Sequence, residues 1–134
     1  MKPVIQPDIR YRGLWLLIGI AMVITISLAC LLPGKDLPEV HIWDKAEHMI
    51  AFGSLAFWFG SIVIRRDLPW VAIGVIAFGG LIEVLQGTMG LGRDADWHDL
   101  LADSVGVALG LALVVTPLGR WVHWFEALLA PARP

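Results

Sequence analysis

Residues 99 to 116 read DLLADSVGVALGLALVVT, an apolar run with two acidic residues near its start. A helix turns by about 100° per residue, so Asp99 and Asp103 share a stripe roughly 60° wide with the two glycines of GVALG. An acid that faced lipid near the centre of a bilayer would cost about 2.5 to 3.5 kcal/mol or more. We therefore expect this stripe to face other helices, and the glycines to form a ridge on which a neighbouring helix can approach closely.

The composition of the whole chain has the same membrane character. Hydrophobic residues make up 57% of the 134 residues and charged residues 16%, and the mean hydropathy is +0.73. These values lie far outside the usage of soluble domains, and the length is that of one domain. The formal net charge of −2 provides no overall basic field, so no nucleic-acid partner is expected. Cys30 is the only cysteine, which excludes an intramolecular disulfide.

Four stretches are long and apolar enough to cross a bilayer, which takes roughly 20 residues as a helix. They cover residues 14–32, 46–64, 70–87 and 99–116. No run alternates apolar and polar residues, as the strands of a membrane barrel would. We expect an all-α, polytopic membrane protein with four transmembrane helices in a compact bundle. Six tryptophans are expected to act as interface anchors, namely Trp15, Trp43, Trp70, Trp97, Trp121 and Trp124.

The charges between these stretches predict the orientation of the chain. With a cytoplasmic N-terminus, the inner segments carry seven of the ten basic residues, Lys2, Arg10, Arg12, Arg65, Arg66, Arg120 and Arg133. The outer segments carry three, Lys35, Lys45 and Arg93. Because cytoplasmic loops are enriched in lysine and arginine, this distribution predicts that both termini are cytoplasmic.

Three polar clusters meet on one side in this topology. DKAEH (44 to 48) opens the second stretch, IEVLQ (82 to 86) closes the third, and RDADWHDLLAD (93 to 103) opens the fourth. With four spans, all three positions lie at the outer surface. The ligand-binding candidates are Asp44, Lys45, His48, Glu83, Gln86, Arg93, Asp99 and Asp103.

Simpler interpretations of some of these residues stay open. Asp44 with Glu47, and Asp96 with Asp99, match capping patterns, which account for Asp44, Glu47 and Asp96 without any function. The two cations, Lys45 and Arg93, either neutralise neighbouring acids or bind an anionic ligand. Ionisable residues inside the spans are functional candidates by default.

The candidates for catalysis and for a metal site are the same four residues, His48, Glu83, Asp99 and Asp103. One nitrogen and three carboxylates are compatible with zinc, manganese or magnesium, although no compact motif such as HExxH is present. Carboxylates around a histidine also suit acid and base chemistry, but a structural ion-pair network would perturb them in the same way. Whether the chain is an enzyme therefore stays open.

Taken together, DKAEHMIAF (44 to 52), EVLQ (83 to 86) and GRDADWHDLLADSVGVALG (92 to 110) resemble the VanZ-like family of small bacterial membrane proteins. Members of that family share the pattern DK..H...F in one helix, E..Q at the end of the next helix, and R.....D...N/D..G...G at the start of the last helix. The resemblance covers about residues 40–112 and implies that residues 1–134 form a single VanZ-like transmembrane domain. Asp103 stands where many relatives have asparagine. The matching positions are Asp44, Lys45, His48, Phe52, Glu83, Gln86, Arg93, Asp99, Asp103, Gly106 and Gly110.

The resemblance implies a multi-pass protein of the bacterial cytoplasmic (inner) membrane. It also implies a cell-envelope role, because the namesake is linked to low-level resistance to teicoplanin-type glycopeptide antibiotics. The first hypothesis is an outer-facing polar pocket that binds a lipid head group or a cell-wall precursor. The second is a membrane-embedded hydrolase or transferase, dependent on metal or on acid and base chemistry, that acts on a lipid-linked substrate. The third is a structural or transport component, and transport by so few helices would require an oligomer.

Overall fold

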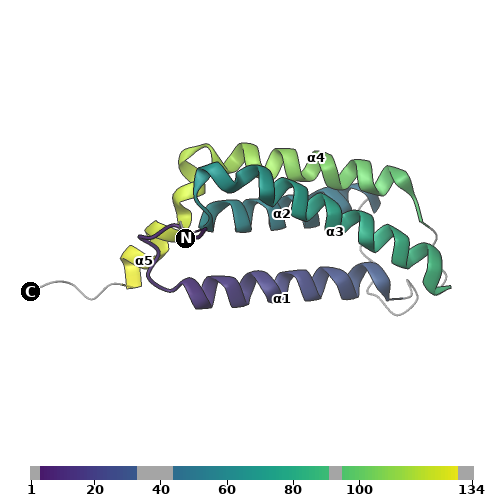
Figure 1. The fold of residues 1–134 in the computed structure, drawn as a ribbon, viewed down its shortest axis with the longest axis horizontal. Coiled ribbons are helices and arrows are strands. Elements are labelled where there is room, and N and C mark those ends of the chain that lie inside the picture. The colour runs from purple at the N-terminus through teal and green to yellow at the C-terminus, as the bar shows by residue number, and fades with distance from the viewer. Residues whose placement is uncertain (1–3, 33–43, 91–94, 130–134) are drawn as a thin grey trace, which may run out of the picture.

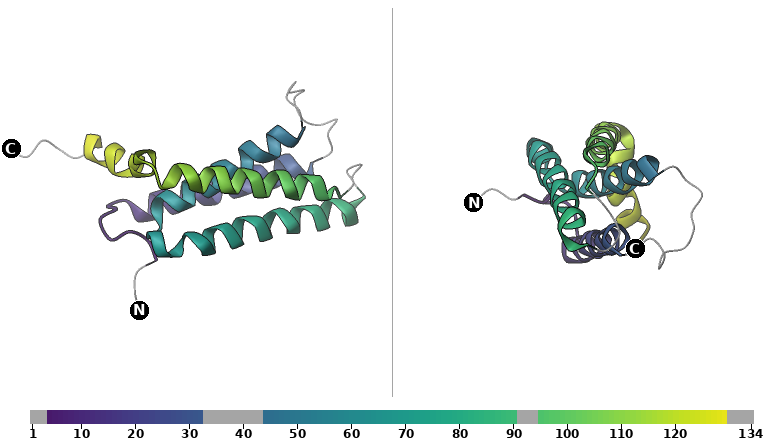
Figure 2. Two further views of the ribbon diagram at one scale, coloured as in Figure 1. Left: turned by 90° about the horizontal axis from the view of Figure 1, so that it is seen from above. Right: turned by 90° about the vertical axis from the view of Figure 1, so that its right-hand side faces the viewer.

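A computed structural model of the chain describes residues 4–32, 44–90 and 95–129. Four long helices run side by side, and a short fifth helix lies at one end of them (Figures 1 and 2). The helices are α1 (Arg12–Leu31), α2 (Asp44–Ile62), α3 (Leu68–Met89), α4 (Trp97–Val114) and α5 (Trp121–Leu129). Two 3₁₀ turns, η2 (Arg65–Asp67) and η3 (Pro117–Arg120), join α2 to α3 and α4 to α5. Within the described residues there is no β-strand, and only an isolated bridge pairs Ile5 with Val63. The expected all-α fold is confirmed.

The ends of the helices follow local sequence signals. Gly90 ends α3 with a φ of 63°, a left-handed conformation that glycine adopts without a steric penalty. At the start of α4, the Asp96 side chain accepts a hydrogen bond from the His98 backbone N–H at 2.9 Å. This is the N-cap interaction that the sequence suggested for Asp96.

Three helical segments of the described chain are long and apolar enough to cross a membrane: Arg12–Leu31, Arg65–Met89 and Trp97–Val114. They correspond to the first, third and fourth stretches expected from the sequence, with bounds that differ by a few residues. Helix α2 has 19 residues but is not among these segments. It contacts α1, α3 and α4, so much of its surface faces protein.

Helices α2 and α4 touch backbone to backbone. Gly106 lies against the carbonyl of Met49, and Gly110 lies against the carbonyl of Gly53. On the other side of the contact, a Cβ atom added to Gly53 would lie 2.9 Å from the carbonyl oxygen of Gly106. A side chain at any of these glycines would push the helices apart, which confirms the glycine ridge expected on α4.

The end of the bundle at α5 holds an arrangement that the sequence did not predict. The Glu126 carboxylate on α5 accepts hydrogen bonds from the backbone N–H groups of Arg10 and Tyr11, at 2.8 and 2.9 Å. It also accepts one from the indole N–H of Trp15 at 2.8 Å. Trp15 is only 4% exposed, so its expected role as an interface anchor is wrong. By contrast, Trp70 and Trp97 are 70% and 68% exposed, as anchors should be, and Trp43 lies outside the described residues.

Candidate functional site

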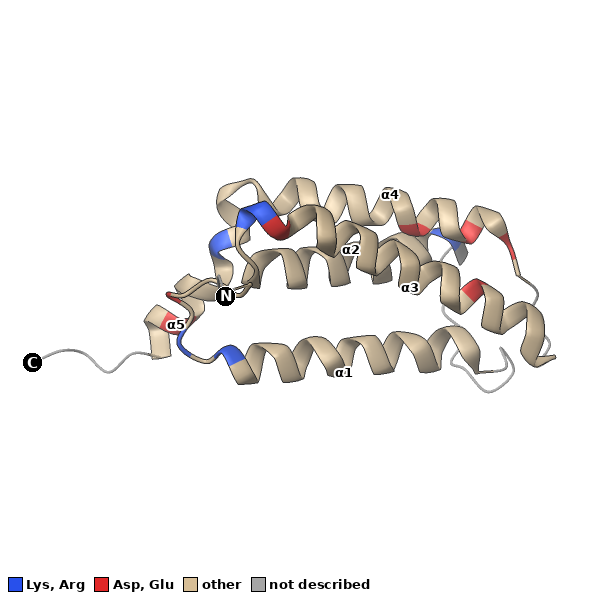
Figure 3. Cartoon of the chain, in the orientation of Figure 1, with Lys and Arg blue, Asp and Glu red and all other residues tan. Residues whose placement is uncertain are grey.

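The polar candidates gather at the end of the bundle opposite α5 (Figure 3). His48 comes from α2, Glu83 from α3, and Asp99 and Asp103 from α4; all four side chains are buried. Together with Lys45 and Asp96 they are called the polar cluster below. Periodicity places each residue on its buried face: the α4 stripe of acids and glycines is buried, as is the stripe of Gly79, Glu83 and Gln86 on α3.

His48 is held by a carboxylate on the neighbouring helix. Its Nδ1 atom lies 2.9 Å from Oδ1 of Asp103, within hydrogen-bonding distance. Its ring lies parallel to that of Phe52, with an interplanar angle of 2° and centroids 6.1 Å apart. The other ring nitrogen, Nε2, lies 3.8 Å from Oδ2 of Asp99. The imidazole is therefore oriented by Asp103 with its far edge turned toward Asp99.

Lys45 pairs with Asp99 of α4 and with Asp96, the residue that caps the start of that helix. Its Nζ atom lies 2.6 Å from Oδ2 of Asp96 and also forms an ion pair with Oδ1 of Asp99. The hydrogen bond from Lys45, assisted by donors on His98, holds the pKa of Asp96 well below its usual range. This end of the cluster is thus partly neutralised, as one interpretation of Lys45 expected.

Glu83 reaches across from α3. Its Oε2 atom accepts a hydrogen bond from the Asp96 backbone N–H at 2.7 Å, while its buried Oε1 atom has no hydrogen-bond partner in the described part of the chain. Oδ2 of Asp103 is in the same condition. It faces Gly79, where an added Cβ atom would lie 2.5 Å from it. The glycine leaves the space that this carboxylate occupies.

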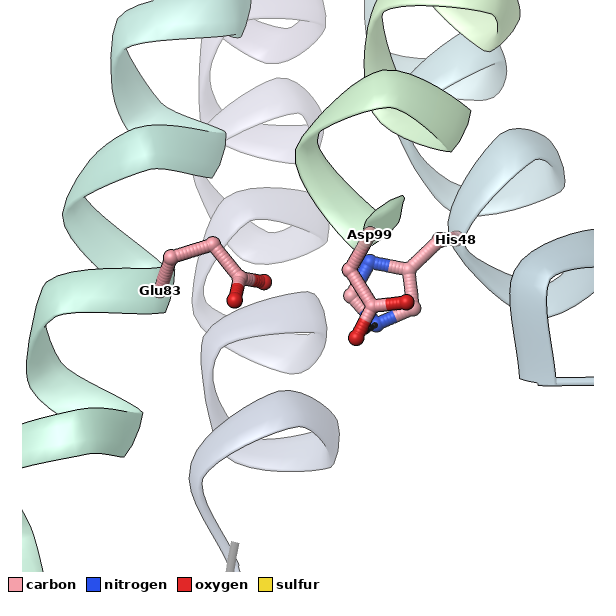
Figure 4. A group of neighbouring side chains, drawn as sticks. All are labelled: His48, Glu83 and Asp99. Atoms are coloured by element: carbon pink, nitrogen blue, oxygen red, sulfur yellow. Dashed lines mark ion pairs between the residues drawn. The ribbon is translucent and has the colours of Figure 1, made fainter. Parts of the chain in front are cut away.

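Three members of the cluster have the spacing of a potential metal site. One ligand atom from each of His48, Glu83 and Asp99 lies within 4.8 Å of the other two. Figure 4 shows the Glu83 carboxylate pointing from α3 toward Asp99 and His48. Asp103, the fourth metal candidate from the sequence, is not part of this group, and its Oδ1 atom contacts His48 instead.

The other expected site residues have different positions. Gln86 donates a hydrogen bond from Nε2 to the Cys30 carbonyl at 2.9 Å, which ties α3 to α1. Asp44 begins α2 but its side chain is not described, and Arg93 lies outside the described residues. The sequence favours a capping role for Asp96 over a chemical one, and in the structure Asp96 also contacts Lys45 and Glu83. Its long-range partners leave no local sequence signal beyond the cap.

Comparisons with known proteins do not identify this arrangement. Models of protein families, curated proteins and solved structures all gave no match to the chain.

Proposed function

We propose that the chain is a VanZ-like protein of the bacterial inner membrane, a single domain with four spans and both termini in the cytoplasm. The ordered motifs of residues 40–112 support this assignment. The basic residues Arg12, Arg65, Arg66 and Arg120 lie at the α5 end of the bundle, and most described acids lie at the other end (Figure 3). The asymmetry in basic residues is the one that orients membrane proteins with their positive side in the cytoplasm.

The path of α2 supports its role as a span beside the three segments that are apolar enough to cross a membrane. The N-terminal segment that leads into α1 lies beside the end of α2: the Gln6 N–H donates to the Ile62 carbonyl at 2.9 Å, and the Ile64 N–H donates to the Val4 carbonyl at 3.0 Å. Helix α1 leaves this end of the bundle, and α2 returns to it. If α1 crosses the membrane, α2 therefore covers the same depth in the opposite direction. Near its polar start, the His48 side chain is buried against Asp103 of α4.

We propose that the polar cluster binds the head group of an envelope lipid or a cell-wall precursor, and thereby lowers susceptibility to teicoplanin-type antibiotics. The observation that carries this proposal is the convergence of buried ionisable residues from three helices on one end of the bundle. A purely structural lock would be expected to satisfy its own polar groups, because each buried unsatisfied group costs about 1 to 3 kcal/mol. Here Oε1 of Glu83 and Oδ2 of Asp103 have no partner among the described residues.

The test is antibiotic susceptibility in a host that lacks the protein and is complemented with variants at equal membrane abundance. The variants His48→Ala, Glu83→Gln and Asp99→Asn are expected to lose the teicoplanin phenotype given by the original chain. Asp67→Asn serves as the control, because Asp67 lies in η2 at the opposite end of the bundle. If the three variants protect as well as the original chain does, the polar cluster has no part in the phenotype and the proposal is wrong.

A binding measurement identifies the ligand class directly. Protein extracted in mild detergent is analysed by native mass spectrometry for retained lipids, with phosphatidylglycerol and undecaprenyl phosphate added as probes. Retention by the original chain and by Asp67→Asn, together with loss in Glu83→Gln, is expected. Equal retention by all three proteins would assign the bound lipid to the apolar surface of the helices instead.

A further inference from the structure

The contact between Asp103 and His48 has the form that proteins use to prepare a histidine for a metal ion. A metal-binding histidine usually donates the N–H of its other ring nitrogen to a carboxylate, which fixes both the tautomer and the orientation of the ring. Asp103 Oδ1 lies 2.9 Å from Nδ1 of His48, and Nε2 is turned toward Asp99, 3.8 Å from its Oδ2 atom.

Glu83 adds an independent observation on the opposite side. Its side chain is more than nine-tenths buried, and its Oε1 atom has no hydrogen-bond partner in the described part of the chain. The carboxylate points toward His48 and Asp99 (Figure 4). A buried carboxylate oxygen that receives no hydrogen bond destabilises the folded state. A cation placed between these three side chains would give that oxygen a partner.

We propose that His48, Glu83 and Asp99 bind a divalent metal ion, with Asp103 as the positioning residue for His48. Ligand atoms around zinc, at bond lengths of about 2.0 to 2.2 Å, lie roughly 3.4 Å apart. The ligand atoms of this group lie within 4.8 Å of one another. Side-chain movements on the order of 1 Å would bring these atoms to the spacing of zinc ligands.

The charges of the cluster favour a divalent ion. Glu83, Asp99 and Asp103 are three buried carboxylates, and Lys45 reaches only Asp99 among them through a described ion pair. Two positive charges at the centre of the group would offset the carboxylates where water is scarce.

The donor set selects the kind of metal ion. One imidazole nitrogen and two carboxylate oxygens suit zinc or manganese, whereas calcium and magnesium prefer oxygen donors alone. Three protein ligands leave a coordination position for another group. This next step rests on the proposed function: a phosphate of the bound head group takes the open coordination position of the metal ion. The positive charge of the metal ion then explains how so acidic a cluster can bind an anion.

The experiment measures metal in the full chain after purification in mild detergent. Elemental analysis is expected to find close to one equivalent of zinc or manganese in the original chain. After stripping with a chelator, titration with Co²⁺ is expected to produce the visible absorption bands of a low-symmetry site, and Zn²⁺ is expected to displace them. The variants Glu83→Gln and His48→Ala should lose both signals.

Two further variants separate metal binding from folding. Glu126→Gln alters a buried glutamate at the far end of the bundle and should retain full metal stoichiometry. Asp103→Asn keeps an acceptor for His48, so it should retain the stoichiometry but bind Zn²⁺ about 10- to 100-fold more weakly, the usual effect of a changed outer-shell partner. Circular dichroism confirms that each variant keeps its helices.

The outcomes decide the proposal separately from the proposed function. Metal-free protein that gives no Co²⁺ bands and no shift in Tm with Zn²⁺ would overturn the metal site, and so would equal binding by the original chain and Glu83→Gln. If the metal site fails while His48→Ala still loses the teicoplanin phenotype, head-group binding stands without a metal. If metal binds but the variants keep the phenotype, the metal site stands and the proposed function falls.

Discussion

His48 on α2 and Asp103 on α4 meet through a buried contact of 2.9 Å between Nδ1 and Oδ1, one residue away on α2 from the place where the Met49 carbonyl lies against Gly106. The polar contact and the closest backbone approach thus occupy the same level of the bundle. Because each arrangement depends on the spacing of the two helices, a change at either one should be felt at the other.

The first prediction concerns this pair. Asp103→Leu leaves the Nδ1 side of His48 without its carboxylate and should lower the free energy of unfolding by about 1 to 3 kcal/mol. Adding His48→Phe removes both partners, so the double variant should be less destabilised than the sum of the single variants predicts. Reversible unfolding in mixed micelles with increasing SDS measures all three. Strict additivity would show that the two side chains do not interact in the folded protein.

The second prediction concerns the glycines. Gly106→Ala places a methyl group against the Met49 carbonyl and should destabilise the bundle by about 1 to 3 kcal/mol. Gly80→Ala on α3 is the matched control, because a Cβ atom there would have no neighbour within 4 Å. That control should be neutral or more stable by up to about 1 kcal/mol. The same SDS titration measures both, and similar losses in the two variants would contradict the close helix contact.

The third prediction concerns pH. Burial raises the pKa of Glu126, but the donors on Arg10, Tyr11 and Trp15 outweigh it and hold the pKa below its ordinary value of 4.5. A lowered pKa in the folded state means that the ionised group stabilises the fold above the ordinary pKa, and that this stabilisation is lost as the pH falls through the lowered value. The difference in Tm between the original chain and Glu126→Gln should therefore be largest near pH 7 and shrink below about pH 4. A difference that stays constant from pH 7 to pH 3 would show that the charge of Glu126 does not contribute.

The fourth prediction tests the topology. In a Cys30→Ala background, Trp97→Cys places a thiol at an exposed position at the start of α4, and Leu118→Cys places one at an exposed position in η3, just beyond the other end of α4. A maleimide that cannot cross membranes should label position 97 in intact cells and position 118 only after permeabilisation. The original chain serves as a control, because Cys30 is buried. Labelling of position 118 alone in intact cells would reverse the proposed orientation.

Much of the bundle could be predicted because its signals are local and periodic. The acids and glycines of α4 recur at helical spacing, so the sequence predicts that they share a face, and the structure buries that face. Contacts between distant segments leave no such pattern. Trp15 and Glu126 are 111 residues apart in the chain, and an apolar indole near the end of a span has the same local signature whether it faces lipid or a buried carboxylate.

The polar cluster shows the same limit. Periodicity predicts that His48, Glu83 and Asp99 face inward, but it does not predict which ring nitrogen of His48 meets which carboxylate. The division of roles between Asp103 and Asp99 depends on the depth of each residue along α4 relative to α2. That register is fixed by the glycine contacts between the two helices, which the sequence shows only as small residues at helical spacing.

The direct contact of the α2 and α4 backbones also divides the polar cluster into a part held rigidly by these two helices and a part carried by α3. Two helices, α2 and α4, carry His48, Asp99 and Asp103, and contacts between their backbones set the distance between these helices. These three residues therefore form one rigid unit. Glu83 belongs to α3 and points toward His48 and Asp99 from the opposite side (Figure 4). A change in the position of α3 alone should therefore alter the affinity of the polar cluster for its ligand. The rigid pair of α2 and α4 would keep the geometry that selects the ligand.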